Sequence, residues 1–329
     1  MSQPRYSFRD LKPDTGSFAS EVIAGLSQPQ KALSPKYFYD ERGSALFERI
    51  CELPEYYPTR TEMALMHAHG REMASLLGPD CLLVEYGSGS GQKTLQLIEQ
   101  LQPAAYMPID ISGAQLRNFA ASLTARFPHL RVAAVCADYT QDFALPDVAG
   151  VRAGRRAAYF PGSTIGNFTI DEARDFLRRA ARMVMPGGAM LIGVDLKKAE
   201  ALLNAAYNDA QGVTADFNLN LLARINRELD ANFDLAAFRH HAFYNARAGR
   251  IEMHLVSMKD QSVSVAGRSF VFGRNETIHT ENSYKYSIDE FAQLAGEAGF
   301  RAERCWVDRD SFFSVHYLVA QTKPVPGSR

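Results

Sequence analysis

A glycine-rich turn constrains the fold of this chain more than any other stretch. The apolar run Cys81-Leu82-Leu83-Val84 predicts a buried strand, and Glu85-Tyr86-Gly87-Ser88-Gly89-Ser90-Gly91 closes it. Glycines at alternate positions remove Cβ atoms from the turn, so a ligand can approach the backbone and φ can be positive without strain. The helix predicted from Lys93 would point free N–H groups at that ligand. The turn therefore indicates a binding site for a nucleoside-bearing ligand.

Strand-like and helix-like segments alternate after Cys81, which is typical of a parallel sheet with helices on both faces. Further strands are expected at 104–110, 131–138, 156–162 and 189–195. Capping boxes at Thr169–Glu172 and Ser287–Glu290 each predict the start of a helix. The final segments, 302–307 and 314–321, are expected to complete this sheet as a strand pair.

The alternation stops after Asp195. The following residues predict one or two helices and then several strand-like pieces, at 200–210, 219–229, 242–244, 251–255 and 269–272. This mixture indicates an inserted module with α+β character. A length of 329 residues is enough for two modest domains.

The composition is that of an ordinary globular protein. Lys and Arg number 36 against 37 Asp and Glu, so neither a nucleic-acid nor a membrane surface is indicated. The cysteines are scattered without a C-x-x-C pair, and the side chains of the neighbours His240 and His241 should diverge, so no metal is expected. The polar start, Met1 to Asp10, and the lack of an apolar run of about 18 residues predict a cytoplasmic protein.

Two acids at strand ends narrow the choice of nucleoside ligand. Asp110 follows Gly87 by roughly 20 positions, the offset at which an acid accepts hydrogen bonds from ribose hydroxyls. From this pattern NAD and S-adenosylmethionine both remain open. The G-x-G-x-G spacing differs from the G-x-G-x-x-G of pyrophosphate sites, and the final strand pair resembles the sheet of class I methyltransferases, so S-adenosylmethionine is favoured. Asp138 would then reach the adenine amino group, with Tyr139 beside the ring.

Several longer segments of the sequence indicate a protein family more specifically than the glycine turn does. They are Tyr37-Phe38-Tyr39-Asp40, Gly43 to Phe47, Leu53 to Glu62, Phe160 to Asn167, Tyr207-Asn208-Asp209 and Phe217 to Glu228. With the rest of the chain they resemble the histidine Nα-methyltransferase family of ergothioneine biosynthesis. The resemblance implies the first step of that pathway, stepwise trimethylation of the L-histidine α-amine to hercynine. It also implies S-adenosylmethionine as the cofactor and S-adenosylhomocysteine as its product.

The resemblance further implies an α/β fold, a class I (Rossmann-like) methyltransferase sheet with an inserted α+β substrate-binding domain. Residues 61–196 and 287–321 would form the domain that binds S-adenosylmethionine, and residues 10–60 and 197–286 the substrate domain. The expected partners are L-histidine and its mono- and dimethylated intermediates. We expect a monomer that binds neither nucleic acid nor membrane.

Site residues follow from the same resemblance. The implied cofactor residues are Tyr39, which closes over the ligand, and Gly87, Lys93, Asp110, Asp138 and Tyr139. The implied substrate residues are Tyr56, Gly162, Asn167, Tyr207, Met253, Glu281 and Ser283. Asn167 and Tyr207 would hold the substrate carboxylate and amine, Tyr56 would line the same pocket, and these three are the implied catalytic residues. Met253, Glu281 and Ser283 would recognise the imidazole.

Alternatives remain at this point. Tyr57 competes with Tyr56 for the same role, because the alignment can shift by one residue. Without the resemblance, Tyr56 and Tyr207 would be interpreted as packing aromatics, Met253 as core, and Glu281 with Ser283 as a solvated turn. The same scaffold could methylate another amino acid, such as a tryptophan derivative. An NAD-dependent oxidoreductase or a non-catalytic nucleotide-binding module is the alternative from another class.

Overall fold

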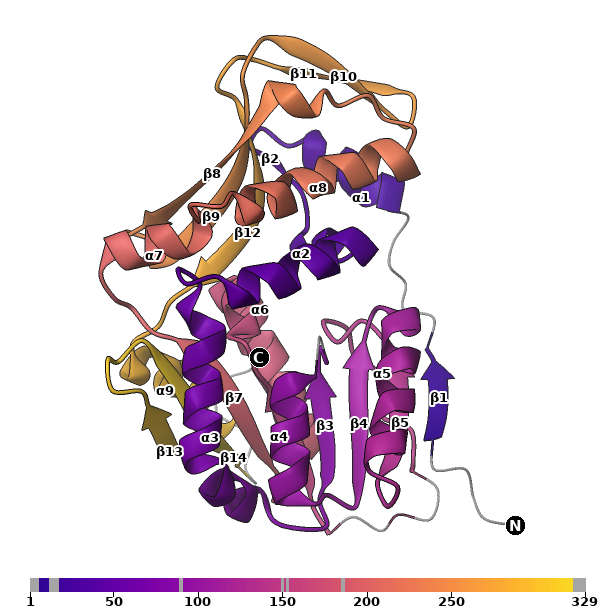
Figure 1. Cartoon of the computed structure of the whole chain (residues 1–329), viewed down its shortest axis with the longest axis vertical. Coiled ribbons are helices and arrows are strands. Elements are labelled where there is room, and N and C mark those ends of the chain that lie inside the picture. Colours follow the sequence, from indigo (N-terminus) through magenta and orange to yellow (C-terminus); the bar gives the residue numbers. More distant parts are fainter. Residues whose placement is uncertain are drawn as a thin grey trace. The chain divides into compact units, whose positions relative to one another are not determined.

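The chain divides into two units in the computed structural model (Figure 1). The structure describes residues 6–11, 18–88, 91–148, 151, 154–184 and 187–321, so Gly89 of the glycine turn lies outside the described residues. Unit 1 comprises Met1–Asp14, Arg60–Leu196 and Tyr286–Arg329, and unit 2 comprises Thr15–Thr59 and Lys197–Lys285.

Unit 1 is built on an eight-stranded sheet with the order β1-β5-β4-β3-β6-β7-β14-β13. The pairs from β1 through β7 are parallel, whereas β14 runs antiparallel to both of its neighbours. The predicted parallel sheet with a final strand pair is therefore confirmed. The strands are β1 (Tyr6–Asp10), β3 (Leu82–Tyr86), β4 (Ala105–Asp110), β5 (Arg131–Cys136), β6 (Arg156–Phe160), β7 (Ala189–Asp195), β13 (Phe300–Val307) and β14 (Phe313–Ala320).

Strand β1 was not predicted. Its side chains are exposed or half-buried, and the sequence was interpreted as a polar N-terminus. At the edge of the sheet, β1 is joined to β5 by backbone hydrogen bonds, which any side chains permit. Polarity therefore did not reveal it.

Helices cover both faces of this sheet, which explains why its central strands are continuous apolar runs. One core cluster joins the strands to α3 (Tyr57–Leu77, in unit 1 from Arg60), α4 (Gln92–Leu101) and α5 (Gly113–Arg126). The other face packs against α6 (Ile170–Val184) and α9 (Ile288–Glu297). Both predicted capping boxes are present, at Thr169 with Glu172 and at Ser287 with Glu290.

Unit 2 contains a four-stranded sheet with the order β2-β12-β9-β8 and a separate hairpin. Its strands are β2 (Lys31–Ala32), β8 (Phe238–Asn245), β9 (Arg250–Ser257) and β12 (Thr277–Tyr284), with β10 (Gln261–Val265) and β11 (Arg268–Phe272) in the hairpin. Its helices are α1 (Phe18–Leu26), α2 (Glu41–Glu52), α7 (Glu200–Tyr207) and α8 (Val213–Glu228). Helix α8 begins earlier than predicted because the Asp209 carboxylate accepts from the amides of Val213 and Thr214, at 2.9 Å and 2.8 Å.

Asp40 connects the N-terminal part of unit 2 to helix α8. Its Oδ1 accepts from the Gly43 amide at the start of α2 (2.7 Å) and from Asn220 Nδ2 (2.8 Å), and its Oδ2 pairs with Arg227 (2.7 Å). Burial alone would raise the pKa of Asp40, but the Gly43 and Arg227 hydrogen bonds lower it overall. Three of the sequence segments named above, 37–40, 43–47 and 217–228, therefore contact one another at Asp40.

A β-bulge sets the faces of strand β12. His279 pairs with His254 on β9, but Glu281 pairs with Met253, so Thr280 is an extra residue. Thr280 is buried, and its hydroxyl donates to Asn218 Oδ1 on α8 at 2.8 Å. We call the face toward α7 and α8 the inner face and the opposite one the outer face. The bulge turns Glu281 to the inner face while His279 stays on the outer face.

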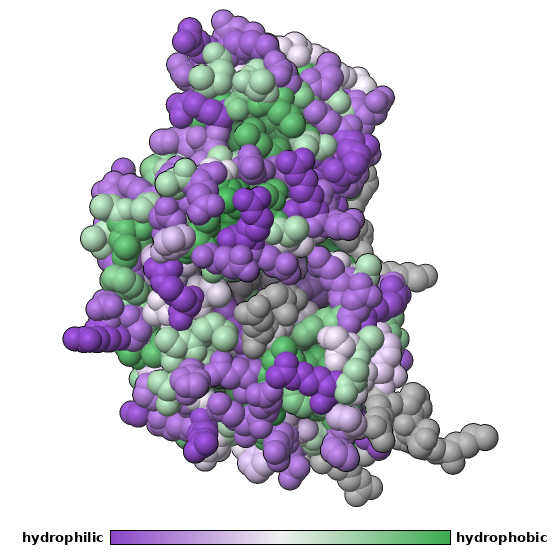
Figure 2. Space-filling view, in the orientation of Figure 1, coloured by the Kyte–Doolittle hydropathy of each residue, from purple (hydrophilic) through white to green (hydrophobic). Residues whose placement is uncertain are grey.

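Figure 2 shows hydrophilic side chains over most of the face in view, with apolar side chains in small patches between them. Each helix in the described part of the chain is too short or too polar to traverse a bilayer.

The glycine turn yields a stability prediction. Gly91 has a φ of +72°, and a Cβ there would lie 2.1 Å from Phe119 Cε2. Gly187, also in unit 1, has a φ of +71°, but no described atom lies within 4 Å of its Cβ position. Both Gly→Ala changes should lower the free energy of unfolding by about 1–2 kcal/mol through backbone strain. Gly91→Ala should lose a further 1–3 kcal/mol, roughly, because the Phe119 ring must move.

Urea unfolding followed by the fluorescence of Trp306 would measure this difference, since Trp306 is the single tryptophan and lies buried in unit 1. Equal losses in the two variants would contradict the close approach of Phe119 to the turn.

Candidate active site

The carboxyl ends of the strands in unit 1 bring together the predicted cofactor residues that lie in this unit, which are all of them except Tyr39. The strand order reverses between β3 and β6, and open α/β sheets bind ligands at such a switch point. Gly87 follows β3 with a φ of +74°, and its amide donates to the Ile109 carbonyl (2.8 Å) on the neighbouring strand. Gly91, with a φ of +72°, is the N-cap of helix α4. The described part of the glycine turn thus has the conformation that the sequence predicts.

Asp110 and Asp138 lie at the ends of neighbouring strands on this edge. Burial raises the pKa of Asp110, although amide hydrogen bonds from Ser112 and Ser88 oppose the rise. The Asp138 carboxylate accepts from Thr140 N (2.9 Å) and Oγ1 (2.6 Å). Both acids are therefore fixed by the loops that follow their strands.

Tyr139 lies in an aromatic group at the same edge. Its ring meets those of Tyr86 and Phe160 edge to face, each with centroids 5.9 Å apart. Tyr86 also packs edge to face on Phe176 at 5.0 Å. Tyr86 thus contributes an aromatic side chain beside Tyr139.

Lys93 is held by a buried carboxylate that the sequence analysis did not assign to the site. Lys93 Nζ forms an ion pair with Glu62 Oε2, and the Glu62 side chain is only 1% exposed. Both Glu62 oxygens accept from the Gly162 amide, at 3.0 Å and 2.9 Å. A Cβ at Gly162, whose φ is +81°, would lie 3.4 Å from Lys93 Nζ. Glu62 thus connects helix α3, helix α4 and the turn after β6.

The turn after β6 carries Asn167 to the same end of the sheet. Gly162 and Ser163 both have positive φ, and Thr164–Asn167 forms a short 3-10 helix. The Ser163 hydroxyl accepts from the Asp195 amide (2.9 Å) at the end of β7, which fixes the turn. Asn167 is half-buried there. Unit 1 therefore supplies two of the predicted substrate residues, Gly162 and Asn167.

The other predicted substrate residues gather on the inner face of unit 2. Tyr56 and Tyr207 meet edge to face with ring centroids 6.2 Å apart. The Tyr207 hydroxyl donates to Ser283 Oγ at 2.8 Å. Met253 pairs with Glu281 across the two strands, and both face inward, Met253 by strand alternation and Glu281 because of the bulge.

Lys285 completes this group and was not predicted. It is 2% exposed, and its Nζ donates to Ser283 Oγ (2.8 Å) and to the Tyr207 hydroxyl (3.1 Å). Strand alternation from Glu281 through Ser283 reaches Lys285, so the spacing could have revealed it.

Glu62 had a comparable signal in the sequence. It precedes Leu65 and Met66 on the buried stripe of α3, where an acid needs a partner.

Two groups on the inner face have strongly altered acidity. Burial raises the pKa of Glu281 to about 7, although the Lys285 ammonium opposes the rise. Burial also raises the pKa of the Tyr56 phenol well above its usual range, and neighbouring Tyr207 adds to this. A protonated phenol beside a carboxylate that titrates near neutrality can bind a polar, ionisable ligand.

The choice between Tyr56 and Tyr57 is informed by their surroundings. Tyr57 is 1% exposed, and its hydroxyl accepts from Lys198 Nζ at 2.7 Å. Tyr56, by contrast, lies against Tyr207, which favours Tyr56 as the pocket residue. Tyr39 also lies in unit 2, 37% exposed, with its ring against those of Phe47 and Phe217.

Comparison with known proteins decides the family. A family described as "Histidine-specific methyltransferase, SAM-dependent" matches residues 18–320. The chain belongs to this family. The strand order of unit 1 and this family membership together give the fold class, that of the class I methyltransferases that use S-adenosylmethionine.

Three relatives show which named proteins the chain is similar to. A histidine N-alpha-methyltransferase of Mycolicibacterium smegmatis is 40% identical, over 91% of this chain and 94% of the relative. Ergothioneine biosynthesis protein 1 of Neurospora crassa is 30% identical, over 85% of this chain but 32% of that longer protein. A 4-dimethylallyltryptophan N-methyltransferase of Aspergillus fumigatus is 28% identical, over 92% of this chain and 93% of the relative.

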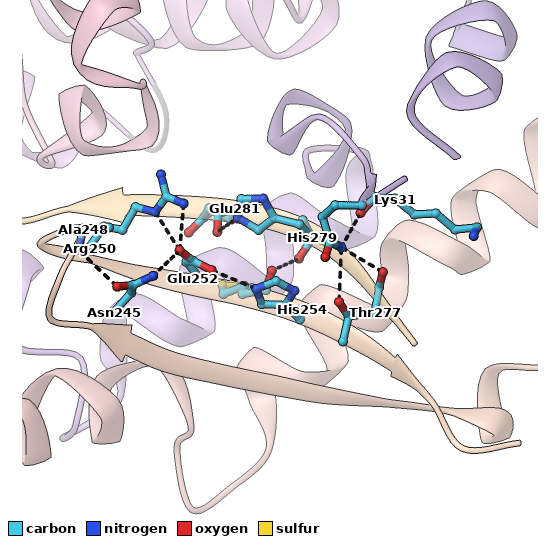
Figure 3. Close-up of polar contacts among 12 residues, drawn as sticks. Lys31, Asn245, Ala248, Arg250, Glu252, His254, Thr277, His279 and Glu281 are labelled. Carbon is cyan, nitrogen blue, oxygen red and sulfur yellow. Dashed lines mark hydrogen bonds and ion pairs between the residues drawn. The ribbon is translucent and has the colours of Figure 1, made fainter. Parts of the chain in front are cut away.

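The histidines of this methyltransferase are arranged in a way that its sequence did not predict. The side chains of His240 and His241 diverge as expected, since His240 bonds the Tyr207 carbonyl (2.8 Å) and His241 stacks on Phe243. On the outer face, however, Glu252, His254 and His279 bring potential metal-ligating atoms together (Figure 3).

Proposed function

We propose that this chain methylates the α-amino nitrogen of L-histidine three times and so forms hercynine, the first step of ergothioneine biosynthesis. S-adenosylhomocysteine leaves after each transfer, and mono- and dimethylated histidine are intermediates. The observation that carries this proposal is the inner-face group of Tyr56, Tyr207, Glu281 and Ser283 in a chain of the histidine-specific family. Action as a cytoplasmic monomer is part of the same proposal.

We assign the cofactor to the carboxyl edge of the unit 1 sheet. Asp110 would accept from the ribose hydroxyls, Asp138 from the adenine amino group, and Tyr139 would flank the ring. Gly87 would allow close backbone approach, Tyr39 would close over the ligand, and Lys93 would pair with its carboxylate. The bound cofactor supplies an electrophilic methyl group on a sulfonium. Support comes from the switch point between β3 and β6 and from the family's dependence on this cofactor.

We assign the imidazole of the substrate to Glu281, Ser283 and Met253. An ionised Glu281 would accept from an imidazole N–H, and Met253 would pack against the ring. A carboxylate left without its hydrogen-bond donor penalises ligands that lack one in that position. The alternative substrate, a tryptophan derivative, carries a larger indole. Glu281 and Met253 therefore favour histidine.

The chain's contribution to methyl transfer is chiefly positioning. The attacking amine must be neutral, and Asn167 would hold the substrate carboxylate while Tyr207 and Tyr56 orient the amine. Lys285 is a positioning residue, because its two hydrogen bonds fix the phenol of Tyr207 and the hydroxyl of Ser283. The trimethylated product carries a permanent positive charge, which the faces of tyrosine rings accommodate.

Incubation of the purified protein with histidine and S-adenosylmethionine tests the reaction. Mass spectrometry should detect mono-, di- and trimethylated histidine in sequence, and added Nα,Nα-dimethylhistidine should be converted to hercynine. Tryptophan and dimethylallyltryptophan, offered in parallel, should stay unmodified. Binding of NAD but not of S-adenosylmethionine in a calorimetric titration would overturn the proposal.

Glu281 should impose a pH dependence on histidine recognition. Its pKa is raised to about 7, and the ionised form is the acceptor, so kcat/KM for histidine should rise with pH through that range. Glu281→Gln should lower kcat/KM roughly tenfold to a hundredfold on the alkaline side, since hydrogen bonds to charged groups contribute about 1.5–3 kcal/mol. The ratio of kcat/KM in the wild type to kcat/KM in the variant should be plotted against pH, because the substrate's own titrations cancel in it.

The affinity of the Glu281→Gln variant for S-adenosylhomocysteine should equal that of the wild type. A ratio that is constant across pH would remove Glu281 from imidazole recognition.

Glu62 should act on cofactor binding through Lys93. Glu62→Gln retains an acceptor for the Gly162 amide but loses the ion pair with Lys93, so titration with S-adenosylhomocysteine should give an affinity about 3- to 10-fold weaker, a typical range for coupled pairs. In a Lys93→Met background the same change should have almost no further effect. Additive losses in the double variant would mean that Glu62 acts independently of Lys93.

A further inference from the structure

The outer face of the unit 2 sheet carries a cluster that the methyl-transfer proposal does not use. Strand alternation sets Glu252 and His254 side by side on β9, and His279 lies directly across from His254 on β12. One potential ligand atom from each residue lies within 4.8 Å of the other two. Figure 3 shows Glu252 between Arg250 and Asn245 on one side and His254 on the other.

We propose that Glu252, His254 and His279 form a binding site for one divalent transition-metal ion of the zinc type. Two imidazoles and a carboxylate are ligands that such ions prefer, and water would complete the coordination. The site lies on the sheet face opposite to Glu281, so it is separate from the proposed histidine pocket and does not depend on it.

The spacing of the ligand atoms suits this ion after a small adjustment. Zinc bonds of about 2.1 Å in a tetrahedron set ligand atoms roughly 3.4 Å apart. Glu252 Oε2 and His254 Nε2 are already 3.2 Å apart. The His279 ring stacks on that of His254 with centroids 4.9 Å apart. The ligand atom of His279 lies within 4.8 Å of the other two, so its side chain would have to approach by up to about 1.4 Å to close the site.

Hydrogen bonds around the cluster resemble the outer shell of metal sites. Metal-bound histidines commonly donate their second N–H to a backbone carbonyl or a carboxylate. His279 Nε2 contacts the Glu281 carbonyl at 3.0 Å, and a proton there leaves the lone pair on Nδ1. Asn245 Nδ2 holds Glu252 Oε1 at 2.9 Å, so that Oε2 faces His254. His254 departs from this pattern, because with Nε2 as the ligand atom its buried Nδ1 has no hydrogen-bond partner among the described residues.

Arg250 opposes a bound cation. Its guanidinium pairs with Glu252 Oε1 at 2.7 Å and lies over the Tyr284 ring. The ligand charge available to a metal is therefore partly neutralised, which should limit the affinity. Replacing Arg250 by Met keeps the packing on Tyr284 and leaves Asn245 to orient Glu252. The Arg250→Met variant should consequently bind the metal more tightly than the wild type.

The alternative is a ladder of stacked rings that binds no metal. Phe243 and His254 stack with centroids 5.6 Å apart, and His241 stacks on Phe243 at 5.4 Å. Substitution by Phe separates the two explanations, because it preserves a stacked ring and removes the nitrogen ligands. His241→Phe is the matched control, since His241 belongs to the ladder but not to the cluster of three.

The test is a calorimetric titration of the full, untagged chain with zinc chloride after removal of metal by a chelator. We expect saturable binding of one zinc ion per chain. His254→Phe, His279→Phe and Glu252→Gln should each weaken it by at least about 10-fold, the lower end of what changes around metal sites cost. His241→Phe should bind as the wild type does. Circular dichroism establishes that each variant is folded, and tighter binding by Arg250→Met tests the site without removing a ligand.

The absence of saturable binding would overturn the proposal, and so would equal affinities in the wild type and the three ligand variants. An Arg250→Met variant that binds no more tightly than the wild type would contradict it as well. A loss of affinity in His241→Phe as large as in His254→Phe would also overturn it, because the ladder and not the three ligands would then determine binding.

Discussion

Removing a carboxylate from water costs several kcal/mol unless a cation, hydrogen bonds or a proton compensates it. The chain meets this constraint in three ways. Glu62 has the ammonium of Lys93 and the amide of Gly162. Glu85, below the glycine turn, accepts from Thr94 and Tyr106, and burial raises its pKa to about 8. Glu281 lies near the ammonium of Lys285, which opposes the effect of burial, and its pKa rises to about 7.

The partners of these acids separate structural acids from a recognition group. Glu62 and Glu85 accept hydrogen bonds from within the fold, so they fix the turns on which ligand approach depends. Glu281 lies on the inner face, and an imidazole N–H of the substrate would donate to its ionised form. The same physical cost that makes Glu62 a positioning residue thus makes Glu281 suitable for discriminating between substrates.

Pattern alone predicted the features that depend on local sequence. The strand, glycine turn and helix around Gly87 follow from hydrophobic runs and backbone freedom, and both capping boxes follow from side-chain spacing. Strand β1 could not be found this way, because backbone pairing with β5 makes it a strand. Glu281 was interpreted from pattern as part of a solvated turn, and only the resemblance to a family assigned it to the substrate. The physical reason is the bulge, since no local signal reveals how β12 pairs with β9. The proximity of His254 and His279 depends on the same pairing.

The bulge at Thr280 also bears on which alignments of the two strands are tolerated. If β12 paired with β9 without the extra residue being set aside, Glu281 would lie directly opposite Glu252. Two carboxylates facing each other across neighbouring strands repel, and a slip of one position also turns side chains to the wrong face. The acid proposed to recognise the substrate therefore also acts against misalignment of the strand that carries it.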